Sequence, residues 1–587
     1  MTRVRTLPEA LAEAARGEEG YVFVANGVET TRSYAALHES SLRVAGALRE
    51  SGLGRGDLVA LVIGDAEPFL TTLFGASIAG VIPASLYPPA TAGDLPHFFA
   101  ATAGLLRTVG ARAVVTTTAL VAGFDALQSS CPDLAIVLST ADLTASAEAT
   151  AVRRSARRRK AFTTSDPGVV QTLRSADISA DDIAFVQFTS GSTSTPKGVV
   201  VTHRNLSANI DAITGPAGLA PSTSDLGVSW LPLYHDMGLV GMTLGALYRG
   251  LSTVLLPPQA FIKRPVEWLR VISRHRGTVS FAPNFAYDLC VRRVKERDLD
   301  GLDLSCWRVA GCGAEPIHAP TLVAFAEKFG AVGFRDTSFL PSYGLAEHVL
   351  AVTFAPRGRR PWVEHLSASD VTERGVATPA NGAGREHVTV VSCGPALPGH
   401  QIRIVDEAGR RLPERAIGEI TLAGPSVTPG YYGDEALTAR TIRAGWLHTG
   451  DLGYLSHGEL FVCGRVKDLI IAHGRKYHPQ DLEWGVDDLA GIRRGRVVAF
   501  GTVEPGRPDR VVIVAEASGT VPVDVLTDAI RRRIVDLCGL FVDEVVLVPG
   551  GTVGRTTSGK VQRAATKTRY ERGTLECGAA TATEQHA

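Results

Sequence analysis

The sequence predicts an α/β protein with a large body and a smaller α+β unit at its C-terminal end. Its 587 residues exceed what one ordinary hydrophobic core accommodates, because domains typically contain about 150 residues. From residue 20 to residue 138, strand-like and helix-like segments alternate, which favours a mostly parallel sheet with helices on its faces. Between residues 483 and 570, three strand-like segments and one helix indicate the second, smaller unit.

The first elements follow from turn signals and hydrophobic periodicity. We expect a hairpin over 21–34 with Asn26-Gly27 as its turn, a helix over 34–50, strands over 58–63, 114–117 and 135–138, and a helix over 203–212. The uncharged run over 68–93 reaches the length of a membrane span, but its threonine, serine and proline residues predict a buried helix followed by a strand. We also expect strand-like segments over 279–289, 307–316 and 341–348.

Composition excludes several partner classes. Sixty basic residues balance sixty acidic ones, which gives no general attraction to nucleic acid or to a membrane surface. The basic run over 153–160 contains no aromatic residue and indicates a solvated linker. Eight cysteines without a C-x-x-C pair argue against a zinc ribbon and a disulfide framework, and the N-terminus lacks a signal-peptide pattern. We therefore expect a cytoplasmic protein with no membrane span.

Residues 185–203, FVQFTSGSTSTPKGVVVTH, place a hydroxyl-rich loop between two apolar strands. Six hydroxyls, one glycine and the free backbone N–H groups favour an anion-binding nest, and Lys197 adds a positive charge. The loop departs from the Walker pattern at two positions, and a plain serine- and threonine-rich surface turn is the alternative interpretation. Because only nine of the sixty basic residues are lysines, Lys197, Lys467 and Lys560 draw particular attention.

The stretch TSGSTSTPKGVVVTH resembles the phosphate loop of adenylate-forming enzymes, the superfamily of acyl-CoA synthetases, luciferases and nonribosomal adenylation domains. Further segments resemble that superfamily in the same order along the chain: WRVAGCGAEP, PSYGLAEH, GWLHTGD, CGRVKDLII and GRTTSGKVQR. The resemblance extends over about residues 20 to 570. It implies a large multi-sheet N-terminal domain, a small C-terminal domain, and activation of a carboxylate with ATP and Mg²⁺ that releases pyrophosphate.

The resemblance also implies roles for individual residues. The nucleotide phosphates would be held by Thr189, Ser190, Gly191, Ser192, Thr193 and Lys197. The adenine would contact Gly313, Ala314 and Glu315 and stack on Tyr343, while Gly344 and Leu345 would approach the acyl phosphate. Asp451 would accept both ribose hydroxyls, which suits a carboxylate presented by a Thr-Gly turn, and Arg465 would contact the ribose or the α-phosphate. Glu347 would ligate Mg²⁺, and Lys560 would bridge the attacking carboxylate and the α-phosphate.

His235 stands in the segment LPLYHDMGLVG. A lone histidine is usually structural, but the resemblance implies that this one lines the carboxylate pocket and takes part in catalysis. The form Y-H-D-M-G-L is particularly similar to that of the fatty acyl-AMP ligases. The apolar, glycine-rich helix that follows, residues 238–247, would let a medium or long alkyl chain lie close to the backbone.

The expected domain organisation is an N-terminal domain over 1–465, a mobile lid domain over 466–570 with Lys467 as its hinge, and a disordered tail over 571–587. Residues 355–387 form an extra polar segment that Trp362, Val363 and Val371 would anchor. An insertion at this point marks the fatty acyl-AMP ligases, where it restrains rotation of the small domain and disfavours thioester formation with free CoA. We therefore expect a monomeric enzyme whose partners are a fatty acid and an acyl carrier protein. An acyl- or aryl-CoA ligase and an inactive binding module are the alternatives.

Overall fold

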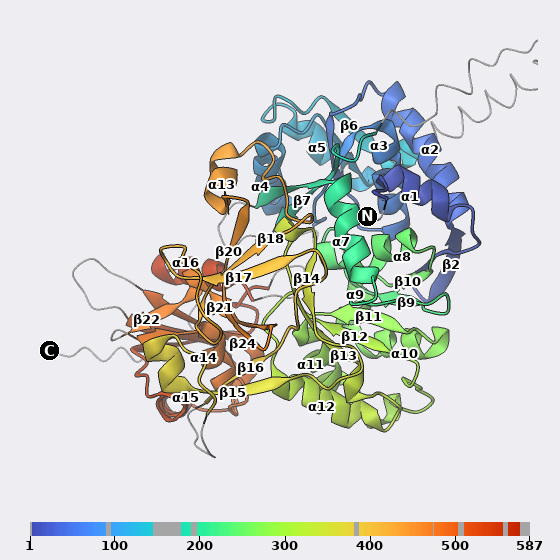
Figure 1. Cartoon of the computed structure of the whole chain (residues 1–587). Helices are drawn as coiled ribbons and strands as arrows, with labels where there is room; N and C mark the ends of the chain where they lie inside the picture. Colours follow the sequence, from blue (N-terminus) through green and yellow to red (C-terminus); the bar gives the residue numbers. More distant parts are fainter. Residues whose placement is uncertain are drawn as a thin grey trace, which may run out of the picture.

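The structure, a computed structural model, describes residues 3–89, 95–144, 178–189, 196–380, 387–472, 475–502, 510–555 and 561–575 (Figure 1). Several predicted features lie outside these ranges. They are the basic run over 153–160, the loop residues Ser190, Gly191, Ser192 and Thr193, the predicted catalytic Lys560, and the tail from residue 576.

A six-stranded sheet forms the first layer of the large body, in the order β6-β5-β3-β4-β7-β8. Its strands are β3 (Leu58–Val62), β4 (Ile82–Ser85), β5 (Ala113–Thr116), β6 (Ile136–Ser139), β7 (Ile183–Thr189) and β8 (Lys197–Thr202). The helices of this part are α1 (Leu7–Ala14), α2 (Tyr34–Glu50), α3 (Ala66–Ala79), α4 (Leu95–Thr108) and α5 (Val121–Leu127). All neighbouring strands are parallel except β7 and β8. The predicted alternation and the mostly parallel sheet are thus confirmed.

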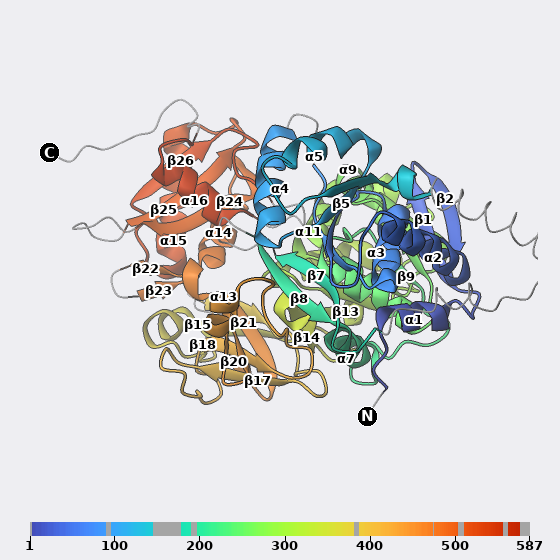
Figure 2. The ribbon, with the colours of Figure 1, turned by 90° about the horizontal axis from the view of Figure 1, so that it is seen from above.

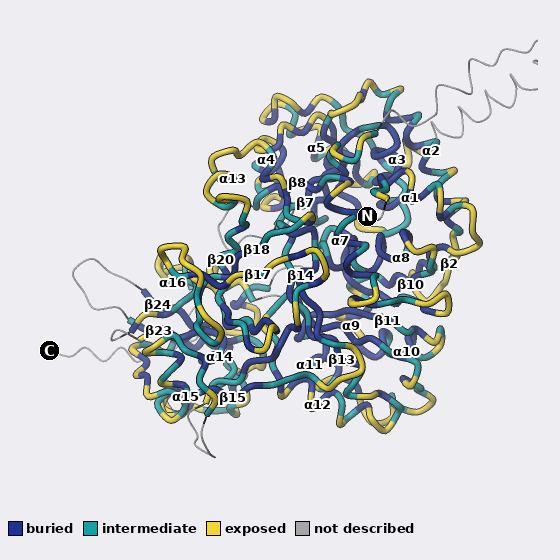
Figure 3. Tube along the Cα trace, viewed as in Figure 1, coloured by how far each residue is buried: buried dark blue, intermediate teal, exposed yellow. Residues whose placement is uncertain are grey.

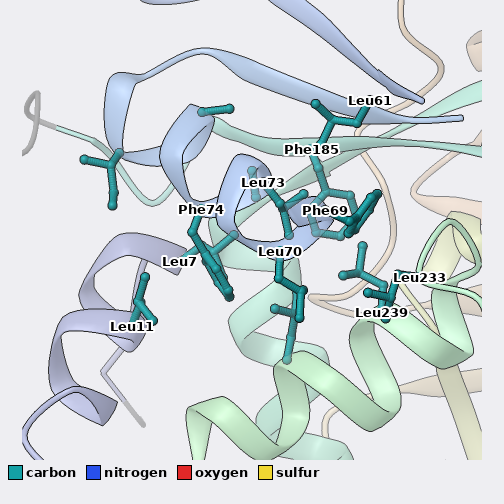
Figure 4. Close-up of a cluster of buried hydrophobic side chains, with 14 of the residues drawn as sticks. Leu7, Leu11, Leu61, Phe69, Leu70, Leu73, Phe74, Phe185, Leu233 and Leu239 are labelled. Carbon is teal, nitrogen blue, oxygen red and sulfur yellow. The ribbon is translucent and has the colours of Figure 1, made fainter. Parts of the chain in front are cut away.

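Helix α3 is buried along nearly its whole length and is followed directly by strand β4. Its Phe69, Leu70 and Phe74 pack in one cluster with Leu7 of α1 and Phe185 of β7 (Figure 4). This arrangement confirms the predicted buried helix and strand for residues 68–85 of the apolar run. In the ranges that the structure describes, no helix combines the length and the apolar composition needed to cross a membrane.

An eight-stranded sheet forms the second layer, in the order β14-β13-β12-β11-β9-β10-β1-β2. Its strands are β1 (Gly20–Ala25), β2 (Val28–Ser33), β9 (Gly227–Ser229), β10 (Thr253–Leu255), β11 (Val279–Ala282), β12 (Val309–Cys312), β13 (Phe339–Gly344) and β14 (Ala351–Phe354). Its helices are α7 (His203–Thr214), the π-helix η4 (Met237–Leu244), α8 (Gly245–Tyr248), α9 (Pro258–Lys263), α10 (Val266–His275), α11 (Asn284–Arg293) and α12 (Ala319–Gly330). The predicted hairpin is confirmed, because β1 and β2 are antiparallel and both residues of the Asn26-Gly27 turn have positive φ.

The prediction of a strand over 279–289 is wrong in its second half. The strand ends at Ala282, and residues 284–293 form helix α11. Pro283 explains the switch, because it has no N–H for the ladder and its fixed φ suits the start of a helix. The aromatic ring of Tyr287 then packs against Trp268 and Trp307 in the core. Likewise strands cover only residues 309–312 of the segment 307–316 and residues 341–344 of the segment 341–348, in β12 and β13.

A third sheet and the C-terminal unit complete the molecule (Figures 1 and 2). The third sheet contains β17 (Gln401–Val405), β18 (Gly418–Ala423), β19 (Ile442–Arg443), β20 (Trp446–Ser456) and β21 (Glu459–Arg465), with helix α13 (Glu435–Thr441) beside it. The C-terminal unit contains β22 (Ile470–Ala472), β23 (Arg475–Tyr477), α14 (Pro479–Val486), β24 (Ile492–Thr502), β25 (Arg510–Ala517), α15 (Val523–Cys538), β26 (Glu544–Val548) and α16 (Arg563–Glu571). The predicted small α+β unit is therefore confirmed. Figure 3 shows that the buried residues follow the sheets, whereas loops and outer helix faces are exposed.

The segment over 355–387 is folded where the structure describes it. Strand β15 (Val363–Ser367) pairs with β16 (His387–Val391), Trp362 packs edge-on against Phe461, and Val371 is buried. A single helical turn, η8 (Asp370–Arg374), reaches the C-terminal unit, where Glu373 Oε1 lies 2.6 Å from Arg475 Nη2. The expected anchoring is thus present, and the segment is more ordered than the polar sequence indicated.

Candidate active site

A cavity of about 2570 Å³ lies between the large body and the C-terminal unit. Of the predicted site residues that the structure describes, all but Gly313 line it: Thr189, Lys197, His235, Ala314, Glu315, Tyr343, Gly344, Leu345, Glu347, Asp451, Arg465 and Lys467. These residues come from five separate stretches of the chain. Gly313 is required for packing instead, since a Cβ there would lie 2.6 Å from the hydroxyl of Ser342 on the adjacent strand.

The carboxylate of Asp451 is held on both oxygens. Strands β20 and β21 pair Asp451 with Arg465, and the Nε atom of Arg465 lies 2.9 Å from Oδ1 of Asp451. The hydroxyl of Tyr343 donates to Oδ2 at 2.7 Å. Burial, followed by the charge of Asp451, raises the pKa of Tyr343 well above its usual range, so the phenol remains a donor. Each carboxylate oxygen retains a lone pair for a ligand hydroxyl.

Glu347 also lines the cavity, in the helical turn η7 (Ala346–His348) that follows β13. The hydroxyl of Tyr431 donates to its Oε1 atom at 2.9 Å, and the same ring lies 5.5 Å from the ammonium of Lys197. Burial raises the pKa of the Glu347 carboxyl. The turn ends at Val349 with φ 66° and ψ −56°, a conformation that a β-branched residue rarely adopts. Strain of this kind persists only where the surrounding packing fixes the shape of the turn.

The segment that follows β12 presents its backbone to the cavity. Ala314, which lines the cavity, has φ 66° and is a second strained non-glycine position. The Oε1 atom of Glu315 accepts a hydrogen bond of 2.6 Å from the backbone N–H of Phe285, at the start of α11. The Phe285 ring in turn lies 5.8 Å from the guanidinium of Arg555 in the C-terminal unit. The two parts of the protein therefore meet at this wall.

His235 lies in the turn before the π-helix η4, where its Nδ1 atom is 2.7 Å from Oδ1 of Asp236. The expectation that residues 238–247 give an alkyl chain glycine-lined space requires a correction. A Cβ on Gly238 would lie 2.4 Å from a backbone oxygen of the protein itself, and of these glycines only Gly241 lines the cavity. The apolar wall comes mainly from larger side chains outside residues 238–247: Ile213, Leu219, Met237, Phe281, Leu350 and Phe354.

The C-terminal unit supplies two further groups of side chains. Trp484 of α14 packs 4.7 Å from the ring of His318 in the large body. Arg563, the first residue of α16, lies 3.0 Å from Asp468 and 2.8 Å from Glu483. It thereby connects the segment after Lys560 to the turn that contains Lys467. Sequence reasoning missed Arg563 and Tyr431, because their partners lie 80 or more residues away and no local pattern links them.

Comparisons with known proteins agree with this geometry. The family model for AMP-binding enzymes matches residues 11–432. A putative acyl-CoA synthetase of Caulobacter vibrioides (strain NA1000 / CB15N) is 37% identical over 580 residues, which are 97% of this chain and 96% of that protein. A medium-chain-fatty-acid–acyl-carrier-protein ligase of Moorena producens (strain JHB) is 34% identical over 579 residues, 95% of this chain and 93% of that protein.

A solved structure from a study of fatty acyl-adenylate ligases of E. coli and L. pneumophila has the same fold. It matches with a TM-score of 0.86 and 37% identity, and the match covers 97% of this chain and 98% of that chain.

Proposed function

Because the chain belongs to the family of AMP-binding enzymes, we propose that it activates a fatty acid with ATP and passes the acyl group to the phosphopantetheine thiol of an acyl carrier protein. The observation that carries this proposal is the composition of the cavity. A hydrogen-bonded carboxylate, Asp451, and the cations Lys197 and Arg465 lie in the same space as an apolar wall. This combination suits a nucleotide at one end and an alkyl chain at the other.

In the first step, a carboxylate oxygen of the acid attacks the α-phosphorus of ATP, and the bond to the β-phosphate oxygen breaks. Negative charge develops on the phosphate oxygens and on the leaving pyrophosphate, so fixed cations in a partly closed cavity lower the barrier. Lys197 and Arg465 are such cations, and we propose that Lys560 is a third. Asp451 would orient the nucleotide by accepting its ribose hydroxyls.

The chemistry of Glu347 fits a magnesium ion. Mg²⁺ is usually held by one or two carboxylates together with substrate phosphates, and among the described residues no group of three or more acidic, histidine or cysteine side chains offers a complete metal site. Glu347 uses Oε1 for the hydroxyl of Tyr431, and its carboxylate faces the cavity. When bound, the ion would neutralise phosphate charge. Glu347 and Tyr431 would fix its position.

In the second step, a thiol attacks the acyl carbonyl and AMP leaves. The contact between Glu373 of the 355–387 segment and Arg475 of the C-terminal unit supports the carrier protein as the acceptor. A segment that holds the C-terminal unit opposes its rotation unless the acceptor supplies compensating contacts. The name of the Caulobacter relative favours the alternative, a CoA ligase.

The first prediction concerns the ribose. Asp451→Ala should weaken ATP binding by about 1.5–3 kcal/mol, since a charged acceptor of two hydroxyl groups is lost. Calorimetry with ATP and 2′,3′-dideoxy-ATP isolates this contact, because wild type should prefer ATP and the variant should not distinguish the two. Tyr343→Phe is the control: it removes a donor to Asp451 but keeps the carboxylate. A variant that still prefers ATP would exclude the ribose role.

The second prediction concerns Lys560. Lys560→Ala should slow pyrophosphate release with a fatty acid by 10² or more, roughly the effect of removing one preorganised charge stabiliser. Lys567→Ala is the matched control, since this lysine lies on helix α16 and, among described residues, pairs only with Glu571 one helix turn further along. An unchanged rate in the Lys560 variant would contradict its assignment.

The third prediction concerns the acid. The apolar wall formed by Ile213, Phe281 and Phe354 favours a medium or long alkyl chain. Adenylation rates across C4 to C18 acids and several aryl acids should peak among aliphatic acids longer than C4. A preference for aryl acids would contradict the fatty-acid assignment.

The fourth prediction concerns the acceptor. Shortening residues 357–385 would also remove strand β15, so a point change is the cleaner test. Glu373→Ala breaks the contact with Arg475 and should raise the rate of acyl-CoA formation about two- to fivefold, as expected for one ion pair at an accessible interface, without changing adenylation.

Glu407→Ala is the control for this experiment, since it removes the exposed pair with Lys476 outside the segment. Thioester formation with free CoA that already matches adenylation in wild type would identify the protein as a CoA ligase.

A further inference from the structure

Lys467 stands where the resemblance implies a hinge, in the single turn η9 (Val466–Asp468) between β21 and the C-terminal unit. A hinge requires only backbone freedom at this point and gives no role to the side chain. The structure nevertheless directs the residue to the cavity, where Lys467 lines the same space as Lys197, Glu347 and Asp451. A hinge role therefore does not explain why the Lys467 side chain lies at the cavity.

The surrounding charges do not neutralise it. Its neighbour Arg465 is paired with Asp451, and its other neighbour Asp468 is paired with Arg563. Within the described ranges, Lys467 itself has no ion pair and no hydrogen bond through its side chain. Burial and the nearby positive charges of Arg465 and Lys197 lower the pKa of Lys467. Three cations, Lys197, Arg465 and Lys467, thus line the cavity with only two carboxylates, Asp451 and Glu347. The pKa of Glu347 is raised, which reduces its negative charge.

An excess of positive charge in a partly closed cavity favours a polyanionic ligand. We propose that Lys467 is a phosphate-binding residue in addition to a hinge: in the conformation of this structure, its ammonium group binds phosphate oxygens of ATP or of pyrophosphate. This inference rests on the proposed function for the nucleotide itself. A lysine ammonium suits the task because it is a compact charge with three donors that adapts to different phosphate oxygens.

The position of Lys467 links this contact to the domain movement. Rotation of the C-terminal unit about the hinge turns the backbone at Lys467 and carries its side chain away from the phosphates. The cation is therefore present while ATP is bound in the adenylation conformation and is withdrawn when the C-terminal unit turns for the transfer step. A residue with a purely conformational role would alter the transition between states and leave phosphate affinity unchanged.

The test compares ligands with and without phosphates. Calorimetry of the full chain with ATP, pyrophosphate and adenosine is performed on wild type, Lys467→Met, Lys467→Arg and Lys476→Met. Lys476→Met is the matched control, because this exposed lysine lies on β23 near the hinge and outside the lining of the cavity. Loss of one charge-assisted contact should raise the Kd for ATP and for pyrophosphate about tenfold or more in Lys467→Met.

Adenosine binding should change less than twofold in the same variant, and Lys467→Arg should restore ATP affinity to within about threefold of wild type. An equal loss for adenosine and ATP, or no loss for either, would overturn the inference. A wild-type protein that binds neither ATP nor pyrophosphate would overturn the proposed function as well. Normal wild-type binding with an unaltered Lys467→Met variant would overturn only the role of Lys467.

Discussion

The site depends above all on one pairing across two strands, Asp451 on β20 with Arg465 on β21. Only 8% of the Asp451 side chain is exposed, and a buried carboxylate is costly unless it is paired and hydrogen-bonded. The pairing fixes the carboxylate for a ligand and fixes the end of β21, from which the chain continues into the hinge turn. The same interaction therefore orients this wall of the cavity and sets the starting point of the C-terminal unit.

Two ion pairs of Arg563 connect three elements around the start of the C-terminal unit. Arg563 links the start of α16 to Asp468 in the hinge turn and to Glu483 on α14. Because all three side chains are mostly buried, these two ion pairs resist independent movement of the turn η9 and of helix α16. Contacts with the large body are more exposed: the ion pairs are at Arg475 and Lys476, and the ring contacts are at Trp484 and Arg555. Such a difference suits a unit that moves as one body against its neighbour.

Two positions of backbone strain lie in or next to the cavity lining. Ala314 and Val349 both have positive φ values that glycine would adopt freely; Ala314 is itself a predicted site residue, and Val349 lies two residues after Glu347. Unfavourable conformations of this kind persist only where the surrounding packing determines them. Here the packing comes from β12, β13 and β14, which lie side by side in the eight-stranded sheet. The rigid sheet thus supplies the free energy that keeps the turns of the site in place.

The sequence by itself determined the order of most elements, the hairpin at Asn26-Gly27, and, among the motif residues that the structure describes, the cavity position of all but Gly313, because turn chemistry, hydrophobic period and motifs are local. It did not determine where α11 replaces a strand, or that the glycines at 238 and 245 face the protein rather than the cavity. Those outcomes depend on which surfaces pack together. Tyr431 meets Glu347 across 84 residues and Arg563 meets Asp468 across 95. Only the tertiary structure brings such groups together. The free energy of a buried pair depends on the packing around both partners, and the pair produces no periodic pattern in the sequence of either segment.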